Sequence, residues 1–181
     1  METTKKAVEF IKELVLAVLM ALLFTSFIIS HNKIPSPSMV STINVGDHIL
    51  TNMLPYYYRD PHRGEIVVFK QENEGKIESW VKRVVGEPGD TIDILDGNVY
   101  VNGEQLDESS YLVDSGISNP IQSMSVSFPY KVPSGEYFLM GDNRPQSHDS
   151  RYLGAIKREK IYGKAWVKIY PFSQVGKLNY K

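Results

Sequence analysis

The feature that most constrains the fold is an uncharged apolar run near the N-terminus. Residues 14–30, LVLAVLMALLFTSFIIS, contain no charged side chain. As a helix the run would be roughly 25 Å long, slightly shorter than a bilayer hydrocarbon core of about 30 Å. Phe10 and Ile11 extend the apolar surface, and the long stem of Lys12 can reach the headgroups. We therefore expect a transmembrane signal-anchor helix over 14–30.

Two other interpretations of this run are weaker. A buried helix of a soluble protein would normally carry a polar stripe, and none interrupts the run. A cleaved secretory signal would have a shorter apolar core followed by a small-x-small site. Lys5, Lys6 and Lys12 precede the run, whereas Lys33 alone follows it closely. This bias predicts a single-pass protein of the cell membrane, with residues 1–13 cytoplasmic and 31–181 extracytoplasmic.

Composition sets further limits. The chain has 181 residues, enough for about one ordinary domain and a short extra segment. With 20 Lys and Arg against 21 Asp and Glu, it has no basic field, so no nucleic-acid partner is expected. The absence of cysteine excludes disulfides and thiolate metal sites.

After the apolar run the hydrophobic period becomes that of strands. Asp96-Gly97 predicts a tight hairpin turn within 91–106, and Asn102-Gly103 predicts a second turn. A short helix is expected only near 155–161. We expect a mainly β fold: the N-terminal transmembrane helix, then an antiparallel β-rich domain with a core (31–94 and 131–181) and a small inserted hairpin lobe (95–130). Further strands are expected at 47–53, 64–70, 79–85, 136–142 and 164–172.

Familiar catalytic and metal-binding patterns are missing from the sequence. His31, His48, His62 and His148 are scattered, without an H-E-x-x-H motif, and there is no G-x-S-x-G elbow. The aspartates of 90–96 lack the spacing of a calcium loop. We expect neither a metal nor a cofactor.

The stretch IPSPSMVST, residues 34–42, raises the first question of chemistry. Pro35 and Pro37 fix their own φ angles and bias the residues before them to extended conformations. Ser36 and Ser38 are two residues apart, so a stiff extended segment would present both hydroxyls on one side. A juxtamembrane linker is the plain alternative.

A lysine in the strand 80–85 is the second unusual feature. Lys82 would share a strand face with Trp80 and Val84, while Arg83 would point the other way. Lysine can act as a base only when neutral, and lowering its pKa from about 10.4 to about 8 requires roughly 3 kcal/mol from the surroundings. The alternative is an edge-strand lysine that prevents aggregation.

Three blocks carry a family resemblance: SPSM (36–39), KRVVGEPGD (82–90) and GDNRPQSHDSR (141–151). In this order they make the chain resemble the bacterial type I signal peptidases, which are membrane-anchored serine proteases with a lysine general base. The resemblance implies an endopeptidase that removes signal peptides from secreted precursors after small-x-small sites. Its partners would be precursor proteins and membrane lipid, and we expect a monomer without a cofactor.

The resemblance also implies roles for particular residues. Ser38 would be the nucleophile and Lys82 the general base. The Ser36 hydroxyl and the Ser38 backbone N–H would form the oxyanion hole, and Ser147 would orient the Lys82 amine. Arg83 would pair with Asp142 and Asp149 with Arg151 as structural support; ordinary surface ion pairing is the alternative.

The substrate would bind as an added strand beside 34–36 and 80–82. The matching pocket residues, which could equally be plain core, are Ile34, Met39, Ile43, Trp80 and Val81. One departure is Ser41, which stands where the family usually has proline. Three rival classes stay open: a self-cleaving repressor of the Ser/Lys type, for which no DNA-binding region is visible, a non-catalytic peptide-binding domain, and a structural anchor protein.

Overall fold

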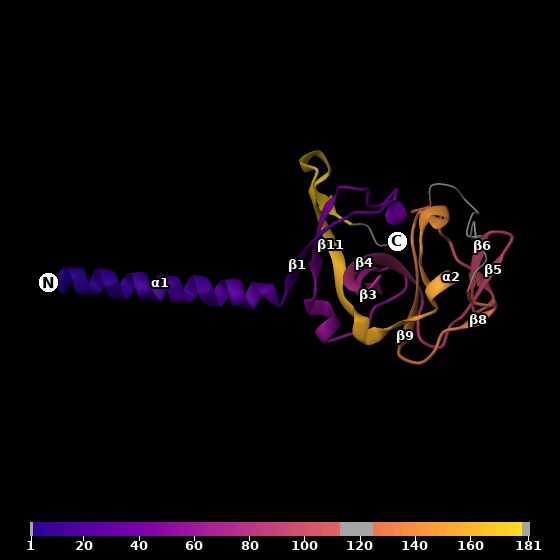
Figure 1. Ribbon diagram of the computed structural model, residues 1–181, viewed down its shortest axis with the longest axis horizontal. Coiled ribbons are helices and arrows are strands. Elements are labelled where there is room, and N and C mark those ends of the chain that lie inside the picture. Colours follow the sequence, from indigo (N-terminus) through magenta and orange to yellow (C-terminus); the bar gives the residue numbers. More distant parts are fainter. Residues whose placement is uncertain (1, 113–124, 179–181) are drawn as a thin grey trace.

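The computed structural model describes residues 2–112 and 125–178. Helix α1, Glu2–Ser26, projects from a mainly antiparallel β domain (Figure 1). Among the described residues, no helix combines the length and apolar character needed to cross a membrane. Most of the described residues after α1 lie in two antiparallel sheets and their connections, so the fold is mainly β, as expected.

The N-terminal helix ends four residues before the predicted boundary at Ser30. The Thr25 and Ser26 hydroxyls donate to carbonyls of the preceding turn, and the last backbone bond is from Ile28 N to Thr25 O (3.0 Å). Ile29 then begins strand β1, Ile29–Lys33, which pairs antiparallel with β2, His48–Asn52. The β-branched pair Ile28-Ile29 favours this change from helix to strand.

The main sheet has eight strands in the order β1-β2-β11-β3-β4-β9-β10, with β12 added beside β11. All of its pairings are antiparallel. Its remaining strands are β3 (Ile66–Asn73), β4 (Lys76–Gly86), β9 (Glu136–Met140), β10 (Ile156–Lys157), β11 (Ile161–Tyr170) and β12 (Gly176–Lys177).

A second, four-stranded sheet has the order β7-β6-β5-β8. Both predicted turns are present: Asp96 and Gly97 have φ of 50° and 79°, and Asn102 and Gly103 have φ of 54° and 86°. The sheet includes residues 91–94, which the sequence placed in the core. Its strands are β5 (Thr91–Leu95), β6 (Asn98–Val101), β7 (Glu104–Gln105) and β8 (Tyr130–Lys131). Part of the predicted inserted lobe, residues 113–124, lies outside the described residues.

The short helix lies earlier than predicted. Helix α2 is Ser150–Leu153, whereas 155–161 contains β10 and a 3₁₀ turn. The Asp149 side chain caps α2 by accepting from the Arg151 backbone N–H, and Gly154, with φ of 74°, ends it.

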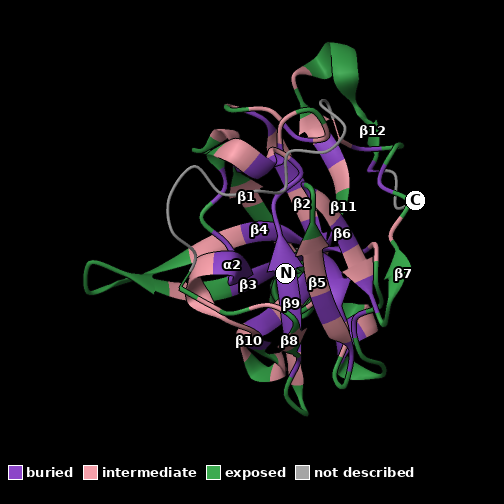
Figure 2. Cartoon of the chain, turned by 90° about the vertical axis from the view of Figure 1, so that its right-hand side faces the viewer, coloured by how far each residue is buried: buried purple, intermediate pink, exposed green. Residues whose placement is uncertain are grey.

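Strand β3 is buried on both faces. Ile66 and Val68 belong to one apolar cluster, which also contains Ile34 and Met39, whereas Val67 and Phe69 belong to a second cluster. Figure 2 shows the buried residues following the central strands. This double burial explains the continuous apolar run 66–69.

Strand β4 has a free edge where the candidate site lies. It pairs with β3 from Lys76 to Arg83, but with β9 only from Arg83 onward. In the described sheet order β1 is a terminal strand. The 79–82 edge of β4 and the outer edge of β1 are therefore both open to an incoming extended chain.

Candidate active site

Ser38 lies in a rigid turn. Pro37–Met39 form a 3₁₀ turn, and Ser36 before it is extended, with φ of −126° and ψ of 155°. The Asn143 backbone N–H donates to Ser38 O (3.0 Å), and the Asn143 side chain donates to Pro37 O (3.1 Å). Ser38 is 6% exposed. The segment is thus a fixed part of the domain, in contrast to a linker.

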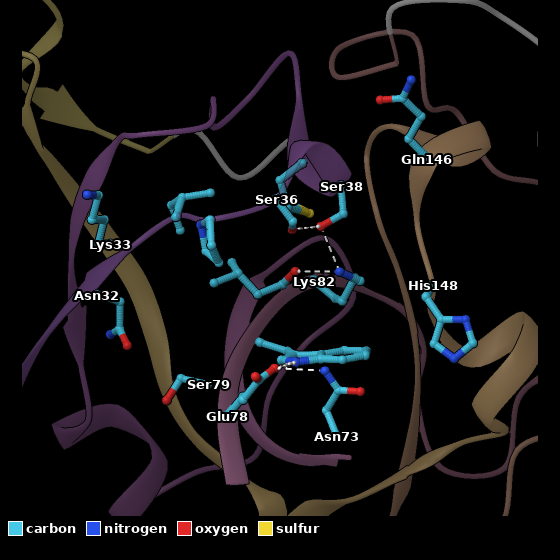
Figure 3. A pocket seen from close by; sticks show the side chains of 15 residues that line it. Asn32, Lys33, Ser36, Ser38, Asn73, Glu78, Ser79, Lys82, Gln146 and His148 are labelled. Carbon is cyan, nitrogen blue, oxygen red and sulfur yellow. Dashed lines mark hydrogen bonds between the residues drawn. The ribbon is translucent and has the colours of Figure 1, made fainter. Parts of the chain in front are cut away.

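Lys82 reaches Ser38 from strand β4 (Figure 3). Its Nζ donates to Ser38 Oγ at 2.8 Å and to Val81 O at 3.1 Å. The side chain is 4% exposed, and the amine lies 5.6 Å from the Trp80 ring centroid. Two residues 44 positions apart in sequence are therefore in direct contact inside the protein.

Burial lowers the pKa of Lys82 to about 8. Asp149 and Asp142 act in the opposite direction, but by less, and Arg151 lowers the pKa further. The shift corresponds to about 3 kcal/mol of destabilisation of the ammonium relative to the neutral amine. About one lysine in ten is then neutral at pH 7, compared with on the order of one in 2,500 for an exposed lysine.

The carboxylates near Lys82 are held in buried ion pairs. Arg83 and Asp142 form two hydrogen bonds of 2.8 and 2.7 Å, and each side chain is 1% exposed. Arg151 and Asp149 form bonds of 2.8 and 2.9 Å and are fully buried. Burial acts to raise the pKa of Asp149, but its bonds and charge interaction with Arg151 lower it overall. The expected pairings are present, in the interior and not on the surface.

Asp142 also contacts the segment that follows Ser38. Its Oδ2 accepts from Thr42 Oγ1 at 2.5 Å, while Asp149 Oδ2 accepts from the Gly141 N–H at 3.0 Å. The Arg83–Asp142 pair therefore joins β4, the residues after Ser38 and the loop after β9.

Ser36 and Ser147, the two other serines with predicted roles, differ in how they lie relative to Ser38 and Lys82. Ser36 is an exposed residue, and its Oγ lies 3.3 Å from Ser38 Oγ. Ser147 is buried, but its predicted hydrogen bond to Lys82 is not formed, and its Oγ has no hydrogen-bond partner within the described part of the chain. The loop packs so closely that a Cβ at Gly141 would collide with Ser147 Oγ and Ser38 O. The sequence placed Gly141 in a family block but gave it no role, because its role depends on this close approach.

A cavity of about 610 Å³ opens beside Ser38 and Lys82. Of the predicted pocket residues, Ile34, Met39, Trp80 and Val81 line it. The fifth predicted residue, Ile43, is not among the residues that line this cavity, and its side chain is fully buried in the apolar core. The cavity also has a polar lining that the sequence did not suggest: Asn32, Lys33, Asn73, Glu78, Ser79, Gln146 and His148.

Comparison with known proteins agrees with this arrangement. A family model described as signal peptidase, peptidase S26, matches residues 7–170. The chain belongs to the signal peptidase family, peptidase S26.

Its similar relatives carry names from the same family. A probable signal peptidase I-2 of Synechocystis is 39% identical, over 92% of this chain and 75% of its own length. A signal peptidase I of Leptolyngbya laminosa is 36% identical, over 94% of this chain and 83% of its own. Signal peptidase I S of Bacillus subtilis is 34% identical, over 97% and 95%. This membership makes the chain a serine peptidase.

This structure also contains a buried ion pair that the sequence did not predict. Arg144 forms a two-bond ion pair with Glu108, and both side chains are buried. Tyr111 Oη donates to the same carboxylate at 2.8 Å, and the Arg83 guanidinium lies 4.0 Å from the Tyr111 ring centroid. Ser41, the departure from the family pattern, donates to Tyr111 O at 3.2 Å. The segment after β7 therefore packs against both the segment that follows Ser38 and the loop after β9.

Replacing Glu108 with Gln should destabilise the peptidase. The variant keeps the shape of the side chain but leaves the buried Arg144 without its carboxylate, so we expect a loss of about 3 kcal/mol of unfolding free energy. Urea unfolding followed by tryptophan fluorescence measures it. Glu104→Gln, an exposed change in the nearby β7, is the matched control. Equal unfolding midpoints for the two variants would contradict a stabilising role for the pair.

Proposed function

We propose that this chain is a signal peptidase I that cleaves signal-peptide-bearing precursors with Ser38 as nucleophile and Lys82 as general base. The observation that carries the proposal is the 2.8 Å contact between Lys82 Nζ and Ser38 Oγ in a buried position beside a cavity. The names of the relatives support the same substrate class.

In the first step neutral Lys82 takes the proton of the Ser38 hydroxyl as Oγ attacks the scissile carbonyl carbon. The tetrahedral intermediate then collapses, and the Lys82 ammonium donates its proton to the leaving amine. The acyl group remains as an ester on Ser38. Lys82, neutral again, takes a proton from water, which attacks the ester. As the signal peptide leaves with a free carboxylate, the Lys82 ammonium returns the proton to Ser38 Oγ, and both groups regain their starting states.

The negative oxygen of the intermediate needs donors close to Ser38. We propose the Ser36 hydroxyl and the Ser38 backbone N–H, since Ser36 Oγ lies 3.3 Å from the attacking oxygen. Oxyanion donors of this kind contribute about 3–4 kcal/mol in other serine hydrolases. For Ser147 we propose a supporting role in which its hydroxyl turns to the Lys82 amine during the reaction.

The substrate would add as a strand along the open edge of β4, with its small side chain before the cut at the apolar end of the cavity. Ile34, Met39 and Val81 lie there and are 4%, 1% and 8% exposed. A pocket of these side chains accepts alanine and excludes larger residues by volume.

Removing either member of the Ser–Lys pair should abolish cleavage. With full-length protein in detergent and a precursor ending in Ala-x-Ala before the cut, we expect Ser38→Ala and Lys82→Met to lower kcat/KM by at least about 10³-fold. Lys76→Met, on the exposed start of β4, and Ser134→Ala are matched controls that should retain activity. Cleavage that survives Lys82→Met would refute the mechanism.

The pH profile should follow the lysine. Because only neutral Lys82 is active and its pKa is lowered to about 8, kcat/KM should rise about tenfold per pH unit below pH 8 and level off above it. Initial rates from pH 6 to 10 measure this. His148→Gln should leave the inflection in place, whereas an inflection near pH 6 that the variant removes would indicate a histidine base.

We further propose that helix α1, through its apolar residues from Leu14 onward, holds the enzyme in the cell membrane as a single-pass anchor, with the N-terminus cytoplasmic. Its support is the apolar surface of α1: Leu16, Met20 and Phe24 are 62%, 63% and 70% exposed. Transfer of such surface from water to lipid is worth roughly 25 cal/mol per Å².

Membrane extraction tests this anchor. The full chain should remain with membranes in alkaline carbonate, whereas a Leu16→Lys/Leu19→Lys variant should be released, because charged side chains are costly in the hydrocarbon region. Protease added outside intact cells should digest the β domain and leave residues 1–13 protected. Release of the unmodified chain by carbonate would contradict the anchor, and digestion of its N-terminus would contradict the orientation.

A further inference from the structure

The cavity beside Ser38 has two chemically different ends. Next to Ser38 its wall is apolar and includes Ile34 and Val81; two positions earlier along each segment, the lining residues are Asn32 and Ser79. Side chains two residues apart on a strand project from the same face. Asn32 and Ser79 therefore continue the wall that Ile34 and Val81 begin. Figure 3 shows them on the opposite side of the cavity from Gln146 and His148.

Tyr162 of β11 links these two polar side chains. Its hydroxyl oxygen lies 3.2 Å from Asn32 Oδ1 and 3.0 Å from Ser79 Oγ. Since the tyrosine has one hydroxyl hydrogen and Asn32 Oδ1 can only accept, Tyr162 donates to Asn32 and Ser79 donates to Tyr162. The Tyr162 ring packs against the apolar cluster that contains Ile34 and Val81. The polar wall is thus built into the core and is not a chance meeting of surface groups.

The wall keeps unused hydrogen-bonding capacity. Asn32 Nδ2 donates to Thr51 Oγ1 at 2.9 Å, and its contact with Ser30 Oγ is long, at 3.5 Å. Ser79 Oγ receives only a 3.4 Å contact from Lys70 besides its bond with Tyr162. Both residues are half-buried. An apolar ligand against them would remove water without replacing its hydrogen bonds, whereas a hydroxyl would replace them.

We infer that Asn32 and Ser79, held in place by Tyr162 behind them, form a subsite selecting a hydroxyl side chain, serine or threonine, at the third residue before the cleaved bond. The inference rests on the proposed function. The residue whose carbonyl Ser38 attacks faces the apolar end. In an extended peptide on the open edge of β4, the next side chain on that face belongs to the residue two positions earlier, about 7 Å away. That distance reaches from the level of Val81 to the level of Ser79.

Peptides that differ at one position test the subsite. We would use one sequence with Ala-x-Ala before the cut and replace its first alanine with threonine or valine, which have nearly the same shape. The expected kcat/KM for threonine exceeds that for valine by about tenfold. Equal values of kcat/KM for the two peptides, or a higher value for valine, would overturn the inference.

Variants assign the preference to the wall. Asn32→Leu and Tyr162→Phe should bring the threonine-to-valine ratio to about one or below, because each removes a polar group from the network. Asn73→Leu makes the same change elsewhere in the cavity lining and should leave the ratio unchanged. A ratio that survives both wall variants would refute the assignment.

The alanine peptide separates this inference from the proposed function. An enzyme that leaves it uncut fails both proposals. An enzyme that cuts it, loses that activity in Ser38→Ala and prefers valine over threonine retains the proposed function and loses only the hydroxyl subsite.

Discussion

The rest of the structure depends on one contact: an amine buried against a hydroxyl without a free carboxylate beside it. Two aspartates lie close enough to Lys82 to raise its pKa, and either one unpaired would hold a proton on the amine. Arg83 and Arg151 each take one of them in a two-bond pair. These buried pairs therefore do two things: they tie three chain segments together, and they compensate the acids so that desolvation decides the protonation of Lys82.

The sheet supplies the second requirement, an open edge at Lys82. Strand β4 pairs with β9 from Arg83 onward, whereas the residues just before Arg83, including Lys82, have no neighbouring strand on that side within the described residues. The paired half fixes the amine in position, while the free half can hydrogen-bond an extended chain. Ser38 reaches this edge from a separate segment that Asn143 clamps through two carbonyls. Ser38 and Lys82 thus come from parts of the chain that only the complete fold brings together.

Local sequence signals predicted the parts of the structure that depend on local chemistry. Alternation located the central strands, and Asp96-Gly97 and Asn102-Gly103 located the turns, because backbone φ is set by the residues themselves. The helix end, the packing of Ile43 in the core and the Glu108–Arg144 pair were not predictable in this way. Each depends on partners distant in sequence: β2 captures residues 29–33, the apolar cluster encloses Ile43, and the segment after β7 meets the loop after β9. Family motifs gave the candidate site residues. They also predicted a Ser147–Lys82 hydrogen bond, which the structure does not form.

The β3–β4 hairpin has a consequence for how such an enzyme can diversify. Its tip, Glu74-Gly75, turns with φ of 49° and 76° and is exposed, while strand β4 carries Lys82 toward its buried end. If a polypeptide binds along β4 as proposed, residues inserted or deleted at the tip change how many of its positions contact the enzyme. The length of that contact and the position of Lys82 would then be set by different parts of one strand, so selection on one need not disturb the other.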